Sequence, residues 1–475
     1  MRSPAANPEL RSSYWLRVRE FAVPPSMIEV AAARRAVGDW AGACAAARVD
    51  VDVEPRSVAS THGRELADRL RADLRHLAPD LLRWHLPRIA PDGLLRPGLT
   101  IALARYEPAG GGGDAVHLVV RTPPAWADAG QRFSLALWDG SRSGADSRHP
   151  HPHPDDRFRL DLHRHLWDAR RAGELRTRSG AGHPPAGSRP ADDPDPLATA
   201  GRRQGWAVDR WAAEAAILLH AEGRPGDTVA VRVRARRRLL LKLIPGGDGP
   251  GPPGARIFWS PPQGRPGARR PSPGPDRPVP VLPDAATWVS PDLELLRAGL
   301  IEPDRLHPLV ASALAPDRPA ATAPSTTCAV GQPWRVRCRG VWHRIGLVDG
   351  VLVALDHDPA EIRREELLAA LTGTPLPCLR TIDEAHRHPE CLPEVRARLD
   401  HGDTTGALAV VEALLGPDAV LRAGALRDEL ETAALRRIEY GLFRAGLAGP
   451  GRGPTAPGHR RTRDRRAYPR HTIAR

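Results

Sequence analysis

Histidine and cysteine residues gather near position 385 in a pattern suited to binding a metal ion. His386, His388 and Cys391 follow one another closely, and Cys378 and Asp383 precede them. Imidazole and thiolate groups are ligands that zinc prefers. The spacing matches no zinc motif, so a polar helix end or turn is the alternative interpretation. The sequence thus predicts a zinc site at His386, His388 and Cys391 as one hypothesis.

A second candidate site is a run of arginines suited to binding phosphate. Val231-Arg232-Val233-Arg234 has the alternation of a strand, so Arg232 and Arg234 would share one face. The nucleic-acid-binding candidates are Arg232, Arg234, Arg236, Arg237 and Arg238. Each phosphate contact would add salt-sensitive affinity. No aromatic pair of the kind that stacks RNA bases accompanies them, and a solvated basic face is the alternative.

Other histidines have weaker patterns. His149, His151 and His153 alternate with prolines, as in a stiff exposed spacer, whereas His163 and His165 would share one strand face and could offer two imidazoles to a metal. His357 lies where a strand is expected to end and could act as a general base. Its neighbour Asp358, followed by Pro359 and Glu361, has the pattern of a helix N-cap instead.

Several common chemistries are excluded by missing motifs. Lys242 is the single lysine among 69 basic residues and lies in Leu-Lys-Leu-Ile-Pro, so no phosphate-binding P-loop is present. The kinase motifs and the Gly-x-Ser-x-Gly elbow are also absent. Glycines 110–113 precede a predicted strand, unlike those of a dinucleotide-binding fingerprint. We therefore predict no catalytic residue and no cofactor other than the zinc of the first hypothesis.

The charge and composition restrict the possible partners less than the pI suggests. The formal net charge is +13, but alanine, glycine, proline and arginine dominate, as in proteins from GC-rich genomes. Residues 449–475 carry eight arginines and one acid, and their composition predicts a disordered tail. Arginine-rich tails bind phosphate without sequence specificity. Arginine abundance therefore supports a nucleic-acid partner only in part.

Cysteine content and hydropathy favour a cytoplasmic protein without a membrane span. The five cysteines are an odd number and contain no Cys-x-x-Cys motif, which favours reduced thiols. The longest apolar stretches fall short of the roughly 20 residues that cross a bilayer. The opening residues lack the apolar region of a secretory signal.

Helices and short strands are expected to position these residues. Helices are predicted over Pro25–Ala47, Gly63–His76 and Asp209–Ala221, and from Pro359 to about Leu447. Strands are predicted at Leu99–Arg105, Ala115–Arg121, Arg132–Trp138, Arg157–Asp161, Thr228–Val233, Arg238–Ile244, Trp334–Arg339, His343–Val348 and Val351–Leu355. Asp349-Gly350 between two alternating runs is a strong hairpin signal.

The predicted fold class is α+β, with several blocks separated by Gly/Pro-rich linkers. It consists of a helical and antiparallel-sheet N-terminal block, a small β-rich middle, and a β-hairpin plus helical C-terminal block. The predicted divisions are an N-terminal extension (1–24), an α+β block (25–176), a linker (177–204), a small αβ segment (205–244), a linker (245–283), a helical segment (284–314), a linker (315–332), the C-terminal block (333–448) and the tail (449–475).

Two short segments share the pattern Gly-Asp-x-x-Gly-Ala between helical stretches. They are Gly38–Ala43 and Gly402–Ala407. Each resembles the turn between the helices of a tetratricopeptide repeat, which implies a pair of antiparallel helices. A solenoid needs about three adjacent repeats, so single helical hairpins are expected. The whole chain resembles a family of uncharacterised proteins from GC-rich actinobacteria, and that resemblance implies no function.

Three function classes follow from these patterns. The leading hypothesis is a non-enzymatic cytoplasmic interaction or scaffold protein whose helical ends bind a protein partner. The first alternative is a nucleic-acid-associated protein that uses the Arg232–Arg238 segment and the tail. The second alternative is a metal-dependent enzyme that uses His386, His388 and Cys391.

Overall fold

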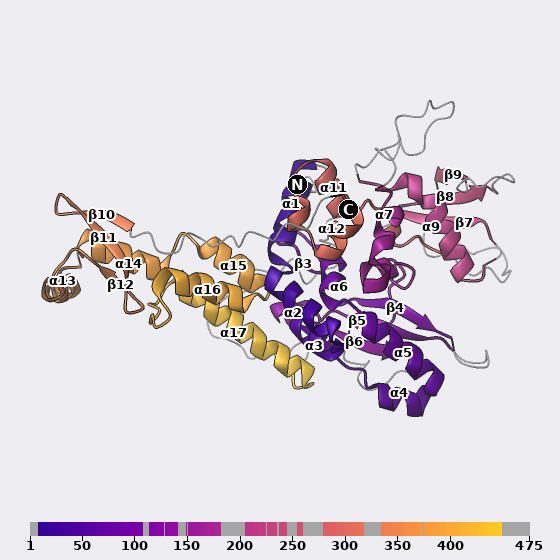
Figure 1. The fold of residues 1–475 in the computed structure, drawn as a ribbon, viewed down its shortest axis with the longest axis horizontal. Coiled ribbons are helices and arrows are strands. Elements are labelled where there is room, and N and C mark those ends of the chain that lie inside the picture. The colour runs from indigo at the N-terminus through magenta and orange to yellow at the C-terminus, as the bar shows by residue number, and fades with distance from the viewer. Residues whose placement is uncertain are drawn as a thin grey trace, which may run out of the picture. The chain divides into compact units, whose positions relative to one another are not determined.

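The chain folds into two compact units that both contain helices and sheet. The computed structural model describes residues 8–107, 114–127, 129–140, 149, 151–181, 205–224, 226–234, 237–244, 254–259, 279–317, 334–373 and 375–448. Unit 1 comprises Met1–Ala125, Phe133–Thr322 and Arg461–Arg475, and unit 2 comprises Trp126–Arg132 and Ala323–Arg460. The elements of both are shown in Figure 1. Mostly antiparallel sheets beside helices confirm the predicted α+β class.

Helices make up the first part of unit 1. They are α1 (Pro8–Phe21), α2 (Pro25–Ala36), α3 (Trp40–Ala46), α4 (Pro55–His62), α5 (Arg64–His76) and α6 (Pro79–His85). Tyr14, Trp15 and Val18 of α1 are buried in the largest apolar core, since their spacing places them on one helical face. Residues 8–21, which the sequence placed in an extension, therefore form a core helix.

A four-stranded sheet contributes the other side of that core. Its strands are β1 (Val49–Val51), β4 (Thr100–Tyr106), β5 (Val116–Arg121) and β6 (Phe133–Trp138), in the order β1-β6-β5-β4. The β4–β5 and β5–β6 pairs are antiparallel, as predicted, whereas β1 runs parallel to β6. A small ribbon joins β2 (Arg88–Ile89) to β3 (Leu94–Leu95).

The predicted strand at Arg157–Asp161 is not present. This segment lies in turns and irregular backbone, and Phe158 and Leu160 bury their side chains in the core. Arg157 and Arg159 instead bind acids on other segments, Asp284 and Glu222. The alternation of apolar and charged residues is real, but it reflects ion pairing rather than a sheet ladder.

The middle of the chain forms a second sheet. Strands β7 (Thr228–Arg234), β8 (Arg237–Ile244) and β9 (Gly254–Trp259) form an antiparallel sheet in that order, and helix α9 (Val208–Ala221) covers one face. Strand β9 lies inside the predicted linker 245–283, where dense glycine and proline hid the alternating Ala255, Ile257 and Trp259. These three side chains pack against the core under α9.

Short helical segments complete unit 1. They are η5 (Arg164–Leu166), η6 (Ala169–Glu174), α7 (Leu175–Arg178), α10 (Asp284–Thr287), α11 (Pro291–Arg297), η7 (Pro303–Arg305) and α12 (Pro308–Leu314). Leu295, Leu306 and Val310 join the same core as α1, so the segment 284–314 packs into unit 1.

Unit 2 is a three-stranded sheet with helices. It contains β10 (Trp334–Cys338), β11 (Val341–Val348), β12 (Val351–Ala354), α13 (Pro359–Thr372), α14 (Pro377–Arg387), α15 (Leu392–Asp400), α16 (Thr404–Leu415) and α17 (Ala425–Arg444). The hairpin predicted at Asp349-Gly350 is confirmed, and both residues have positive φ, 51° and 77°, as a type I′ turn requires. The Asp358 carboxylate accepts a hydrogen bond from the Ala360 N–H, so the predicted N-cap is also confirmed.

The two Gly-Asp-x-x-Gly-Ala segments form the same turn, and Asp403 illustrates its geometry. Gly402 has φ +81°, and the Asp403 N–H donates to the Arg398 carbonyl, which closes the C-terminus of α15. The Asp403 side chain then accepts from the Gly406 N–H and caps α16. A Cβ on Gly406 would lie 2.1 Å from Asp403 Oδ2, so only glycine fits there.

The turn between α2 and α3 repeats this arrangement in unit 1. Gly38 has φ +79°, and Asp39 caps α3 by accepting from the Gly42 N–H. An arginine five residues before each aspartate also contacts that aspartate: Arg34 binds Asp39 and Arg398 binds Asp403. Each segment therefore joins two adjacent helices by one compact, capped turn.

In the part of the chain that the structure describes, no helix has both the length and the apolar character needed to cross a bilayer.

Candidate functional site

Helix α13 presents a stripe of side chains that are exposed among the described residues of unit 2. The exposed fractions of Leu367, Leu368 and Leu371 are 67%, 50% and 84%. Together with Arg363 and Arg364, they follow the spacing i, i+1, i+4, i+5, i+8, which places all five on one side of the helix. We call these five residues the α13 stripe.

Polar contacts, rather than apolar packing, hold α13 to the rest of unit 2. None of its residues is buried or belongs to the apolar core of this unit among the residues described. Its inner side is bound through Arg339, which donates to Glu361 and Glu365. Helices in proteins obtain most of their stability by burying an apolar face. The α13 stripe is therefore an apolar face without a covering surface among the described residues of unit 2.

Three of the candidate arginines, Arg232, Arg237 and Arg238, have described side chains on the sheet β7–β8–β9, where they lie on different faces. Arg232 and Arg238 are directly opposite each other in the antiparallel register, on the face away from α9. Arg237 lies on the other face, with its guanidinium carbon 4.4 Å from the Trp259 ring centroid. The Arg234 side chain and the whole of Arg236 lie outside the described residues.

Two further cations share the face that carries Arg232 and Arg238. Lys242 on β8 is opposite Arg256 on β9, so the register forms two cross-strand basic rows. Between them lie Leu240 and Phe258, which is 38% exposed. Burial lowers the pKa of Arg232, with Arg157 adding to the effect. We call Arg232, Arg238, Lys242 and Arg256 the basic face.

His386, His388 and Cys391 are not brought together as metal ligands. His386 is buried near the end of α14, and its burial lowers the imidazole pKa, helped by Arg422. The His388 side chain is 56% exposed and points toward Glu384, at 3.8 Å. Cys391 occupies the N-cap position of α15. These positions correspond to the helix-end alternative.

A different set of residues gathers potential metal ligands. In the described part of the chain, Cys338, His357 and Cys378 are the set whose donor atoms all lie within 4.8 Å of one another. The sequence pattern had grouped Cys378 with His386, His388 and Cys391 instead. Cys338 and His357 are 40 and 21 residues away from it, so no local spacing could reveal the set. His357, weighed as a general base, lies beside two thiols instead.

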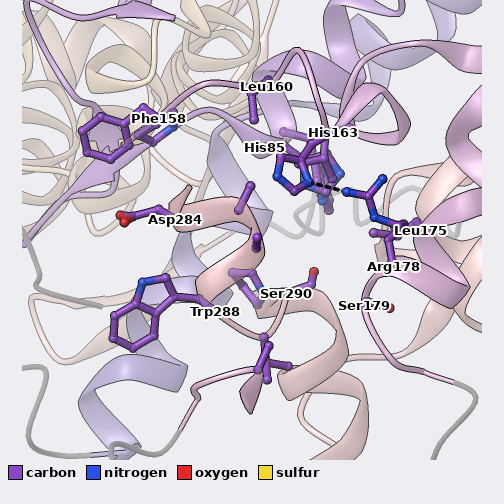
Figure 2. A pocket seen from close by; sticks show the side chains of 18 of the residues that line it. His85, Phe158, Leu160, His163, Leu175, Arg178, Ser179, Asp284, Trp288 and Ser290 are labelled. Carbon is purple, nitrogen blue, oxygen red and sulfur yellow. Dashed lines mark hydrogen bonds between the residues drawn. The ribbon is translucent and has the colours of Figure 1, made fainter. Parts of the chain in front are cut away.

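Unit 1 contains a buried polar cluster, shown in Figure 2. Arg178 donates to both carboxylate oxygens of Glu214, each at 2.6 Å, and to the carbonyl oxygen of Leu162. The same guanidinium lies 3.2 Å from His163 Nδ1, and the His163 and His165 rings meet edge to face. The expectation that these two histidines share one strand face is wrong, because His163 precedes the 3₁₀ turn η5 and His165 lies within it, although their rings are in contact.

The electrostatics of this cluster favour neutral imidazoles. Burial lowers the pKa of His163 well below its usual value, with His165 and Arg178 adding to the shift. Burial likewise lowers the pKa of His165, with the Arg178 charge next. Two uncharged rings thus lie beside an ion-paired carboxylate and resist protonation.

The polar cluster lines a cavity, and the volume of this cavity argues against a substrate site. Its volume is about 80 Å³, whereas pockets for small molecules span roughly 300–1,000 Å³. A water molecule takes about 30 Å³ of liquid volume, so a few waters fill it. The polar cluster is best explained as an internal network that fixes η5, α7 and α9 against one another.

Of the histidines that alternate with prolines, His149 has its two ring nitrogens 2.8 Å from the His151 carbonyl oxygen and 2.9 Å from the Thr122 carbonyl oxygen, so it is built into unit 1. The arginine-rich tail at 449–475 lies outside the described residues.

Comparison of the chain with protein-family models, curated proteins and solved structures finds no match. The fold and sites therefore define a two-unit α+β protein, and its function has to be argued from its surfaces.

Proposed function

We propose that this protein binds a protein partner through the α13 stripe of unit 2, as an interaction or scaffold protein. The observation that carries the proposal is an apolar helix face, 67%, 50% and 84% exposed at its three leucines, on a helix that contributes nothing to the core. Exposed apolar patches of folded proteins commonly mark interaction sites.

The distribution of exposed apolar side chains supports this location. Of the twenty-one large apolar side chains that are exposed among the described residues, fifteen lie in unit 2. Trp342 and Ile438, for example, are 64% and 60% exposed. Unit 2 is therefore much richer than unit 1 in the surface that protein association buries.

The chemistry of the stripe indicates the kind of partner. Arg363 and Arg364 occupy its N-terminal half and the leucines its C-terminal half, whereas Glu361 and Glu365 are bound to Arg339 on the inner side. A complementary surface has apolar side chains next to acidic ones, as on an acidic amphipathic helix. A second copy of the chain is a poorer fit, because two proteins of net charge +13 repel each other.

A capture experiment with matched variants tests the proposal. The tagged full chain is used to recover partners after nuclease treatment at moderate salt, together with Leu367→Asp/Leu371→Asp. A control variant, Glu366→Gln, changes an exposed residue of α13 off the stripe. We expect the wild type and the control to recover the same stoichiometric protein and the double variant to lose at least tenfold.

A separate variant tests whether the arginines of the stripe contribute to partner binding. Arg363→Glu should weaken capture of an acidic partner, and circular dichroism should show helix content unchanged for each variant because the altered side chains are exposed. Equal capture by all variants would contradict the proposal. Light scattering that shows only self-association of the chain through the stripe would also contradict the proposal.

The basic face supports a second candidate function, which is association with nucleic acid. Two cross-strand rows of cations beside the exposed Phe258 offer phosphate contacts and one stacking surface. Binding of a single-stranded oligonucleotide should then weaken linearly in log salt. Arg238→Ala/Arg256→Ala should reduce that slope by about 1–2, whereas Arg427→Ala on α17 should not. A flat salt response would eliminate this candidate.

A further inference from the structure

Three potential metal ligands converge in unit 2 from separate elements. Cys338 is the last residue of β10, His357 lies between β12 and α13, and Cys378 is in the first turn of α14. Their two sulfur atoms and one imidazole nitrogen all lie within 4.8 Å of one another. Ligand atoms around a tetrahedral zinc ion are about 3.3–3.8 Å apart, given Zn–S and Zn–N bonds of about 2.3 and 2.0 Å. Small side-chain movements therefore suffice to bind an ion.

The burial of the three side chains separates this set from an accidental surface group. Cys338 and Cys378 are fully buried, and the His357 side chain is 3% exposed. Exchange of a bound ion with solvent would be slow in such a position. The donor set of two thiols and one imidazole is one that zinc prefers over magnesium or calcium.

The two nitrogens of His357 are in different environments. Nδ1 faces the Glu361 carboxylate, with 3.5 Å between Nδ1 and Oε2. Nε2 is buried and has no hydrogen-bond partner among the described residues. A carboxylate on one ring nitrogen fixes the tautomer and leaves a lone pair on the other, which is the usual arrangement of metal-binding histidines. A buried imidazole nitrogen without any partner is otherwise costly.

A neighbouring histidine fixes the plane of the His357 ring. The His343 ring stacks on it with 4.1 Å between centroids and 28° between planes. Restricting the ring in this way reduces the entropy lost when an ion binds. Glu361 in turn binds Arg339, which precedes β11, so the outer partners of His357 are themselves held in place.

We propose that Cys338, His357 and Cys378 form a zinc-binding site with three protein ligands. The ion would join β10, the start of α13 and the start of α14. The fourth position is available to water or to an added ligand. This site does not overlap the α13 stripe, since neither its ligands nor Glu361 belong to the stripe.

Metal content of the full chain tests the site directly. Protein purified without chelator and without a nickel column should contain about one zinc per chain by elemental analysis. His357→Asn and Cys378→Ser should each lower the content at least tenfold. His388→Gln and Cys391→Ser are the matched controls, and they should retain the metal because they lie outside the set.

Spectroscopy of the wild type keeps the test valid if a variant fails to fold. Cobalt(II) added to zinc-free wild type should produce thiolate-to-cobalt charge transfer and the bands of tetrahedral cobalt. X-ray absorption of the zinc form should show two sulfur ligands and at least one nitrogen. Metal-free wild type that gives no cobalt spectrum would overturn the proposal. Zinc lost only in the His388 and Cys391 variants, or a Cys338–Cys378 disulfide in freshly purified protein, would overturn it as well.

Discussion

At the scale of single residues, charged side chains inside unit 1 form an internal hydrogen-bonded network. Arg178 and Glu214 are joined by two hydrogen bonds, the Glu214 side chain is only 3% exposed and that of Arg178 13%, and two imidazoles lie near them. Buried ion pairs add little net stability, yet removing one partner is costly. The network therefore restricts how α7 and α9 can pack more than it strengthens their packing.

The buried histidines predict a stability that falls in acid. In the folded protein burial lowers the pKa of both His163 and His165, whereas in the unfolded chain an imidazole titrates near 6.5. Stability is thus fully present above about pH 6.5, and it declines as the pH falls below that value because the unfolded chain takes up the protons.

Replacing one of these histidines should flatten the decline. His165→Phe should reduce the slope of unfolding free energy against pH below about 6.5 by up to about 1.4 kcal/mol per pH unit, the contribution of one proton. His220→Gln, on the exposed end of α9, is the control. Denaturant titrations at a series of pH values measure the slope. An unchanged slope in His165→Phe would show that the pKa of His165 is not lowered in the folded protein.

At the scale of elements, the capped turns account for the repeated Gly-Asp-x-x-Gly-Ala pattern. The first glycine supplies the positive φ, the aspartate closes one helix and caps the next, and the second glycine leaves room for the carboxylate. The alanine is buried in both places, at Ala43 and Ala407. The resemblance to tetratricopeptide turns therefore has a local physical cause that does not require a repeat array.

Two glycine-to-alanine substitutions should have opposite signs in unit 2. Gly406→Ala should cost about 1 kcal/mol or more, because its Cβ would collide with Asp403 and remove the cap of α16. Gly441→Ala in α17 meets nothing within 4 Å and should stabilise by about 0.5–1 kcal/mol. Chemical denaturation of the two variants measures the difference. Equal effects would mean that the cap contributes nothing.

At the scale of the whole molecule, the two units differ in how they use their surfaces. Unit 1 has an extensive apolar core and internal ion pairs, and its described residues include the basic face. Unit 2 has a smaller core and most of the exposed apolar side chains. Recognition of a protein partner is therefore best sought on unit 2, and binding of a polyanion on unit 1.

The sequence by itself determined features that depend on neighbouring residues. The alternation of β4, β5, β6 and β7, the Asp349-Gly350 hairpin and the Asp358 cap were all predictable because each depends on local backbone preference. So was the α+β class. Strand β9 was missed because glycine and proline on both sides outweighed its three alternating apolar residues.

Only the tertiary structure decided which distant side chains meet. Cys338, His357 and Cys378 are separated by 19 and 21 residues and converge because β10, β12 and α14 share one core. The basic face gained Arg256 through the pairing of β9 with β8, which a single strand does not specify. The leucines of α13 have the spacing of a core helix, and only the fold shows that they remain outside the core. Local sequence sets the elements, whereas long-range packing sets what each element covers or leaves exposed.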